Sequence, residues 1–247
     1  SRFKPKADRR LKKVFKQIGR PEEAEFVPDQ FQIEAVEHIA ERDVLVSAPT
    51  GSGKTWIAVQ AIDKIFNCGG RSWYASPLKA LSNSKYFEFC ELFGSEHVGI
   101  LTGDRKENTD ASILVGTTEI LRNHLYDAMN TGIDFTADLV VLDEAHYLGD
   151  ADRGVVWEEV MIYLPGRVRL LMLSASVQND HEIASWLSEI RNHPCKVVHS
   201  DERPVPLYPL YLLPSGELLP LSGFDGVTPK IEHFLQQAGK VRHRRAS

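Results

Sequence analysis

The sequence has 247 residues, 43% of them hydrophobic and 26% charged, so it is neither a disordered segment nor a low-complexity fibre. Its three cysteines lack metal-ligand spacing, which argues against a disulfide-stapled secreted protein and favours reduced thiols in a cytoplasmic or, in a eukaryote, nuclear compartment. No stretch approaches the ~20 uninterrupted apolar residues of a membrane helix, so we expect no membrane partner. The length suits one large α/β domain and is short for two.

The net charge of -5 is distributed unevenly along the chain. Residues 1–20 carry nine Lys/Arg and one Asp, and residues 240–247 carry four Lys/Arg and no acid. The body between these basic ends has 16 basic and 33 acidic residues. If this acidic body binds nucleic acid, it must do so through local donors and a few positioned cations, because it has no overall positive field.

The N-terminal residues predict a basic helix. Leu11, Val14, Phe15 and Ile18 recur at helical spacing, with lysines between them. We therefore expect residues 1–24 to form a basic N-terminal extension that contains a helix. Three interpretations stay open for it: a helix packed on the domain, a nucleic-acid-contacting arm, and a targeting segment.

From residue 30 onward, helical and apolar strand-like segments alternate. Helices are predicted over 30–42, 54–66, 79–93, 119–126, 155–164 and 180–189, and strands over 44–46, 72–76, 97–101, 113–116, 139–142 and 170–173. Short apolar strands between helices are typical of an α/β domain whose parallel sheet is covered on both faces. We expect this domain over 25–200, with ligands bound beyond the carboxyl ends of its strands.

The composition changes after about residue 195, where prolines become frequent. Residues 207–221 look like two short strands that turn at Ser215-Gly216, and a helix is predicted near 229–238. Residues 201–247 are therefore predicted to be a linker extension made of a β-hairpin and a terminal helix.

The most specific motif follows the strand at 44–46 and opens the next helix. It is a P-loop, in which glycines let successive backbone N–H groups point at phosphate oxygens, a lysine supplies positive charge and a hydroxyl binds Mg²⁺. Ala48 replaces the first glycine of the general pattern. The motif predicts binding of a nucleoside triphosphate with Mg²⁺ by Pro49, Thr50, Gly51, Ser52, Gly53, Lys54 and Thr55.

An acidic pair follows the strand at 139–142. The strand carries Asp143 and Glu144 to the edge of the sheet that the P-loop occupies. Asp143 is expected to hold Mg²⁺ together with Thr55, and Glu144 to polarise the attacking water as general base, so we predict Lys54, Asp143 and Glu144 as catalytic residues. For His146 two readings stay open: a residue that couples hydrolysis to a neighbouring domain, and a packing histidine.

Phe26 and Gln32 lie before the P-loop. An aromatic ring can stack on a purine, and an amide can bind the N6/N7 edge of adenine. The spacing of the two residues is a weak signal by itself, since a solvated glutamine near a helix start is common.

Together these segments resemble a known family. Ala48–Thr55, Asp143–His146 and Ser174–Ser176 resemble motifs I, II and III of superfamily 2 helicases. Residues 76–83 and 117–121 resemble motifs Ia and Ib of the superkiller-like DExH group. The similarity spans about residues 25–205 and implies a RecA-like fold, namely the first of the two RecA-like domains of an ATP-dependent helicase.

The resemblance also implies roles for single residues. Phe26 becomes an adenine-stacking residue and Gln32 the Q-motif glutamine. Ser174 and Ser176 would couple the γ-phosphate region to the nucleic-acid face, although a plain strand-end turn remains the alternative. The nucleic-acid-binding residues implied by the resemblance are Pro77, Lys79, Gly103, Asp104, Thr117 and Thr118. Their amides, hydroxyls and single lysine suit phosphates and sugars, whereas a solvated lysine is the alternative for Lys79.

A helicase of this superfamily needs a second RecA-like domain, which supplies an arginine finger. The residues after 176 are too few for another α/β domain of ~100–150 residues. We therefore predict the ATP-binding half of a helicase that acts on single-stranded nucleic acid, RNA rather than DNA. Its partner is a second RecA-like domain elsewhere in the full-length chain, although a natural half-helicase stays open as the other possibility. The alternatives are a superfamily 2 DNA translocase and a nucleotide-gated binding module without unwinding activity.

Overall fold

The computed structural model describes residues 6–7, 26–150, 154–176, 179–202, 209–223 and 226–244. The chain divides into two compact units. One takes in Val27–Pro204 and the other takes in Ser1–Phe26 with Val205–Ser247.

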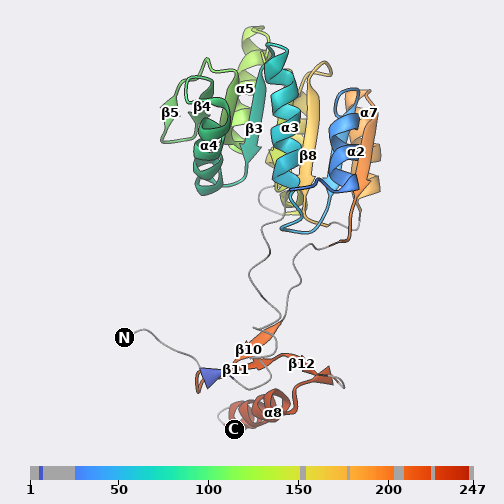
Figure 1. Cartoon of the computed structure of the whole chain (residues 1–247). Coiled ribbons are helices and arrows are strands. Elements are labelled where there is room, and N and C mark those ends of the chain that lie inside the picture. Colours follow the sequence, from blue (N-terminus) through green and yellow to red (C-terminus); the bar gives the residue numbers. More distant parts are fainter. Residues whose placement is uncertain are drawn as a thin grey trace. The chain divides into compact units, whose positions relative to one another are not determined.

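The larger unit is built on an eight-stranded sheet in the order β5-β4-β6-β3-β7-β8-β2-β9 (Figure 1). All neighbouring strands are parallel except β4 and β5, which pair antiparallel at one edge. The strands are β2 (Asp43–Ser47), β3 (Ser72–Ser76), β4 (Val98–Leu101), β5 (Lys106–Glu107), β6 (Ile113–Thr117), β7 (Leu139–Asp143), β8 (Arg169–Ser174) and β9 (Cys195–His199).

Helices cover both faces of this sheet, as the sequence predicts. One face packs against α2 (Gln30–His38), α3 (Lys54–Asn67) and α4 (Lys79–Phe93), which lie together in Figure 1. The other face packs against α5 (Thr118–Thr131), α6 (Gly154–Tyr163) and α7 (Asp180–Arg191). Successive strand residues alternate between these two cores, since Val44 and Val46 join the first and Leu45 joins the second. Every strand in the middle of the sheet is therefore apolar on both sides.

The elements predicted for the larger unit are present, with a few differences in length and number. β3 and α4 have the predicted bounds, whereas α5 continues to Thr131 and α2 ends at His38. Two strands of the eight-stranded sheet, β5 and β9, were not predicted. β5 is two exposed residues long, and β9 is only partly buried, so neither has the apolar run that marks the inner strands. A short 3-10 helix, η1 (Ala145–Gly149), also follows β7.

A buried ion pair lies at the amino end of β2, at the edge of the sheet opposite the carboxyl ends of the parallel strands. Arg191 Nε lies 2.7 Å from Asp43 Oδ2, and the two side chains are 1% and 0% exposed. The guanidinium also donates to the carbonyls of Leu164 and Val168, at 2.8 and 2.6 Å, and Asp43 Oδ1 accepts the backbone N–H of Leu170 at 2.9 Å. Because each charged group is bonded several times, the network is fully satisfied and ties α7 to β2 and β8.

The smaller unit contains the predicted hairpin. β10 (Leu210–Leu212) and β11 (Glu217–Pro220) pair antiparallel, and Gly216 takes the left-handed conformation in the turn, with φ +80°. β1 (Lys6–Ala7) pairs with β11, and β12 (Ser222–Gly223) pairs with β13 (Gly226–Val227). α8 (Pro229–Arg244) extends past the predicted 229–238. The predicted basic helix around residues 11–18 lies outside the described residues.

Candidate functional site

The carboxyl edge of the sheet brings most of the predicted site residues to neighbouring strands. β7, β8 and β2 lie side by side and end at Asp143, Ser174 and Ser47. We call the segments that end or follow them, residues 47–55, 143–146 and 174–176, the nucleotide half. β4, β6 and β3 are likewise neighbours, and we call residues 77–79, 102–104 and 117–118 the nucleic-acid half. β3 pairs with β7, so the two halves are adjacent.

The P-loop folds around its own lysine. Gly51 and Gly53 take positive φ angles of +85° and +78°, and α3 begins directly afterwards at Lys54. Lys54 Nζ donates to the carbonyls of Ala48 and Pro49, at 2.7 and 2.9 Å. The loop thus places an ammonium group at the N-terminus of a helix, where backbone N–H groups and the helix dipole favour an anion.

Gln32 braces this loop from α2. Its side chain is 1% exposed, and Nε2 donates to the carbonyls of Ser52 and Gly53, at 3.1 and 3.2 Å. Its Oε1 accepts the backbone N–H of Asp29 at 2.8 Å. A Cβ at Gly53 would lie 2.5 Å from Gln32 Nε2, so only glycine leaves room for this contact. Phe26 is 61% exposed and falls in the smaller unit, and its adenine-stacking role stays a prediction.

Asp143 is fixed by a residue that the sequence analysis missed. Tyr74, fully buried on β3, donates its hydroxyl to Asp143 Oδ2 at 2.5 Å. Burial, and then the charge of Asp143, raise the pKa of Tyr74 well above its ordinary value, so the phenol stays a proton donor. Asp143 Oδ1 accepts the backbone N–H of Glu144 at 3.0 Å. The carboxylate is therefore held in one orientation before any ligand arrives.

Glu144 has a strained backbone. It takes the left-handed conformation with φ +60°, which is unfavourable for a residue with a side chain. Its Oε2 lies 3.3 Å from Nδ1 of the exposed His146. Strained residues of this kind gather at functional sites because the surrounding structure must support them. Here the strain lies at the predicted general base.

Two buried hydroxyl groups in the nucleotide half have no hydrogen-bond partner among the described residues. They are Ser52 Oγ in the P-loop and Ser174 Oγ at the end of β8. The two segments meet directly, since the N–H of Ala48 donates to the carbonyl of Ser174. Unpaired buried hydroxyls are costly, so these two groups fit a site that receives a polar ligand. Ser176, by contrast, is exposed.

The nucleic-acid half combines buried and exposed residues. Lys79 Nζ lies 3.2 Å from Asp104 Oδ1, and the two side chains are 54% and 71% exposed. Hydrogen bonds from Thr102 and then Lys79 lower the pKa of Asp104. Thr117 and Thr118 are buried at the end of β6, Pro77 is buried after β3, and Gly103 is exposed beside Lys79. The structure therefore brings all six predicted residues to the ends of three neighbouring strands.

The described residues include no group of three or more His, Cys, Asp or Glu side chains that could hold a metal ion. The predicted ligands are the Thr55 hydroxyl and the Asp143 carboxylate, both oxygen donors. Mg²⁺ prefers oxygen ligands and keeps several of its waters, so a site with few protein ligands next to a triphosphate fits this ion. The donor set is thus compatible with Mg²⁺, which would supply a positive charge at the phosphates.

Two further polar groups adjoin the nucleotide half. Lys85 Nζ on α4 lies 3.2 Å from Thr55 Oγ1. Asp180 at the start of α7 accepts hydrogen bonds from His199 Nδ1 and from the Ser47 side chain. Hydrogen bonds to Asp180 and then Asp201 raise the pKa of His199. The sequence alone gives no signal for these contacts, because Thr55 lies 30 residues from Lys85 and Asp180 lies 19 residues from His199.

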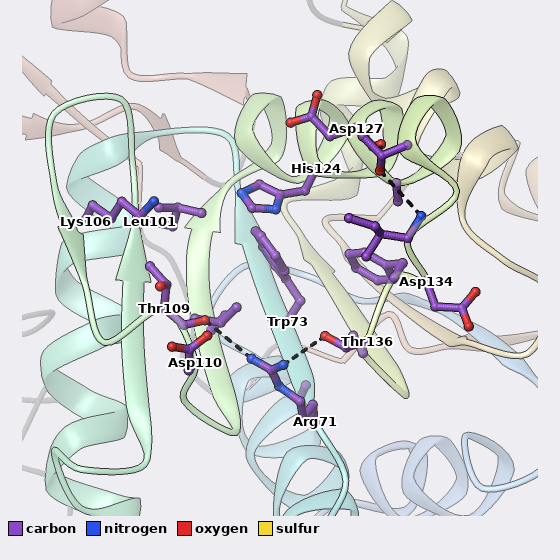
Figure 2. Close-up of a pocket in the computed structure, with 17 residues that line it drawn as sticks. Arg71, Trp73, Leu101, Lys106, Thr109, Asp110, His124, Asp127, Asp134 and Thr136 are labelled. Carbon is purple, nitrogen blue, oxygen red and sulfur yellow. Dashed lines mark hydrogen bonds between the residues drawn. The ribbon is translucent and has the colours of Figure 1, made fainter.

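A separate cavity of about 530 Å³ lies under α5 (Figure 2). Most of its wall comes from the second half of α5 and from the segments that enter β3, β6 and β7. Arg71 spans this wall by donating to Thr136 Oγ1 and to the carbonyls of Thr109 and Ala111. None of the predicted site residues lines the cavity, so it is distinct from the carboxyl-edge site.

Comparison with known sequences identifies the family. A profile of the DEAD/DEAH box helicases matches residues 29–183, which include all of β2, β7 and β8. The chain belongs to the DEAD/DEAH box helicase family. In the part of this helicase chain that the structure describes, no helix is both long and apolar enough to cross a membrane.

The similar proteins include a plant DExH-box ATP-dependent RNA helicase and the yeast antiviral helicase SKI2. The chain is 48% identical over 209 residues to the chloroplastic DExH-box ATP-dependent RNA helicase DExH15 of Arabidopsis thaliana, with 82% of this chain and 18% of that protein covered. It is 43% identical over 199 residues to the antiviral helicase SKI2 of Saccharomyces cerevisiae, with 79% and 15% covered. The chain therefore spans less than a fifth of these relatives.

A solved structure has the same fold. The Hef helicase domain of Pyrococcus furiosus superposes with a TM-score of 0.53 at 21% identity, covering 71% of this chain and 38% of that one. The predicted RecA-like α/β fold is thereby confirmed.

Proposed function

We propose that this chain is the ATP-binding half of an ATP-dependent RNA helicase. The observation that carries the proposal is the carboxyl edge of the sheet, where the P-loop, the Asp143–Glu144 pair and Ser174 follow three neighbouring strands beside the nucleic-acid half. The preference for RNA is supported by the 48% identical relative from Arabidopsis thaliana, which is an ATP-dependent RNA helicase. We infer that residues 25–200 form the ATP-binding domain and 201–247 the linker extension.

The residues act in a defined order. When the triphosphate binds, Lys54 exchanges the carbonyls of Ala48 and Pro49 for the phosphate oxygens, and the P-loop N–H groups bind the same anion. Thr55 and Asp143 would hold Mg²⁺, which supplies positive charge at the phosphates. Glu144 accepts a proton from the attacking water, and its left-handed backbone and its contact with His146 fix its direction.

The proposal includes a second RecA-like domain elsewhere in the full-length protein. The described residues form one sheet domain of this kind, and the smaller unit is a hairpin with a short sheet and a helix. An arginine finger from a second domain raises the rate of related phosphoryl transfers by a factor of roughly 10³–10⁵. We therefore expect this chain to bind Mg²⁺ with ATP and single-stranded RNA, and to hydrolyse ATP slowly. Its three free cysteines support a reducing compartment such as the cytoplasm.

The test uses the 247-residue chain and measures nucleotide binding, strand binding and ATP turnover. We expect fluorescent ATP analogues to bind only with Mg²⁺, and Lys54→Ala to abolish this binding without lowering the melting temperature. Single-stranded RNA should bind more tightly than DNA of the same sequence and stimulate turnover more.

Each contrary result is informative. Stronger stimulation by DNA would favour the DNA translocase instead. Nucleotide and strand binding with no turnover, even when a second RecA-like domain is supplied, would favour a nucleotide-gated binding module. A chain that binds no nucleotide would refute the proposal.

A further inference from the structure

Lys85 lies between the two halves of the site and belongs to none of the predicted motifs. It is in the second turn of α4, with a side chain that is 18% exposed. Nζ lies 2.7 Å from Glu88 Oε2 on the same helix and 3.2 Å from Thr55 Oγ1, which is on α3. An ordinary surface pair three residues apart would explain the first contact only. The second contact reaches the hydroxyl that is the proposed metal ligand.

An ammonium group and a magnesium ion compete for that hydroxyl. In the structure, the oxygen of Thr55 accepts an N–H from Lys85. A divalent cation on the same oxygen would lie beside the ammonium charge, and two positive charges repel strongly in a partly buried site. Glu88 remains available to Lys85 after it leaves Thr55, so the departure does not strand an unpaired charge. We propose that the ammonium group of Lys85 binds the Thr55 hydroxyl in the nucleotide-free protein. When Mg²⁺ binds with the nucleotide, it displaces this ammonium group from the hydroxyl.

This displacement reaches the nucleic-acid half through α4. The helix begins at Lys79, six residues or about 9 Å of helix before Lys85. Between them, Ser82 Oγ bonds to Ser76 Oγ on β3 and to the carbonyl of Gly116 on β6, at 2.8 and 3.0 Å. α4 therefore carries both Lys85, which contacts the proposed metal ligand Thr55, and Lys79, the exposed cation of the nucleic-acid half.

The inference makes Lys85 a positioning residue, and it rests on the proposed function. It acts through Thr55 in the nucleotide half and through the start of α4 in the nucleic-acid half. Removing its charge should therefore change the Mg²⁺ concentration that nucleotide binding requires. It should also change how strongly bound nucleotide alters the affinity for RNA, while the fold stays intact.

The experiment compares Lys85→Met, which keeps the length of the side chain, with Lys85→Arg, which keeps its charge. Lys64→Met is the matched control, because Lys64 lies on α3, over the same face of the sheet, and bonds to the carbonyl of Val36 away from the site. Binding of a fluorescent ADP analogue to the full chain is followed while Mg²⁺ is titrated. We expect Lys85→Met to lower the half-saturating Mg²⁺ concentration roughly 3–10-fold, the effect of removing one charge-assisted competitor. Lys85→Arg and Lys64→Met should stay close to the parent.

The second readout is the affinity for a single-stranded RNA, measured by fluorescence anisotropy with and without Mg²⁺ and ADP. The ratio of the two affinities measures coupling, which is the same in both directions for binding equilibria. In Lys85→Met this ratio should move toward one, and in Lys85→Arg it should equal that of the parent.

Contrary outcomes separate this inference from the proposed function. A parent chain that binds no nucleotide with Mg²⁺ refutes the proposed function, and this inference falls with it. If the parent binds both ligands, an unchanged or higher Mg²⁺ requirement in Lys85→Met overturns the inference alone. An unchanged coupling ratio overturns the link through α4. Melting temperatures of all variants, measured without ligand, exclude a general loss of folding.

Discussion

The nucleotide half and the nucleic-acid half lie on the same edge of one sheet, but they are held in different ways. In the nucleotide half, residues far along the chain fix the functional groups, as Gln32 fixes the P-loop and Tyr74 fixes Asp143. In the nucleic-acid half, the exposed charged groups contact each other, as Lys79 and Asp104 do in their ion pair. Phosphoryl transfer requires charges placed before the reaction, whereas a strand that must move requires contacts that are weak and exchangeable.

The largest effect should come from the general base. We expect Glu144→Gln to reduce ATP turnover by about 10²–10⁴, because the attacking water loses its proton acceptor while the P-loop is untouched. Affinities for Mg²⁺ with ATP and for RNA should stay within about twofold. Turnover is measured by release of labelled phosphate, and both affinities by fluorescence titration. A large loss of RNA affinity would show that the two halves are not separable in this way.

The next effect concerns stability and touches neither half. Arg191→Met leaves Asp43 charged, buried and without its partner, so the free energy of unfolding should fall by about 3–5 kcal/mol. Urea denaturation followed by circular dichroism measures this change. Adding Asp43→Leu to the same chain removes the stranded charge and should recover part of the loss. A decrease below about 1 kcal/mol would mean that water reaches the buried carboxylate.

A smaller effect is expected for Lys79→Gln in the nucleic-acid half. RNA binding should weaken severalfold, and the slope of log affinity against log salt concentration should fall by about 0.7, the value for one lost phosphate contact on a single strand. Nucleotide affinity should not change. Lys196→Gln is the matched control, since Lys196 is also half-exposed and ion-paired, to Glu34 at 2.9 Å, but lies on β9. Equal slopes in the two variants would contradict a specific contact at Lys79.

The smallest effect is a dependence of stability on pH at His199. Asp180 and Asp201 raise the pKa of His199 above 6.5, so its protonated form stabilises the folded state. That contribution is complete below about pH 6.5 and is lost as the pH rises through the raised folded value. The stability difference between the parent and His199→Gln should therefore be larger at pH 6 than at pH 8.5. Urea denaturation at the two pH values tests this, and equal differences would contradict it.

The sequence predicts those parts of the fold that depend on neighbouring residues. The strands and helices of the sheet are found close to their predicted positions, because each buried strand has a continuous apolar run and each helix has a clear period. β5 and β9 were missed, since edge strands are only partly buried and lack such a run. The P-loop and the acidic pair could be read from the sequence because their residues are contiguous.

The supporting residues could not be predicted in the same way. Tyr74 lies 69 residues from Asp143, and Lys85 lies 30 residues from Thr55, so only the folded sheet and its covering helices bring them together. Asp43 and Arg191, 148 residues apart, are likewise indistinguishable in sequence from a solvated acid and a solvated base. The resemblance to a family placed the six residues of the nucleic-acid half, and their contacts with RNA stay a prediction.

The position of β2 in the sheet has a consequence for how the protein is made. β2 is followed by the P-loop, yet its two neighbours among the described strands are β8 and β9, whose residues come more than 120 positions later. During synthesis, β2 therefore has neither neighbouring strand to pair with until β8, more than 120 residues later, has been made. Its five residues, which are buried in the folded sheet, are exposed for all of that time. A nascent chain that stalls before β8 is made presents them to chaperones or to other unfolded chains.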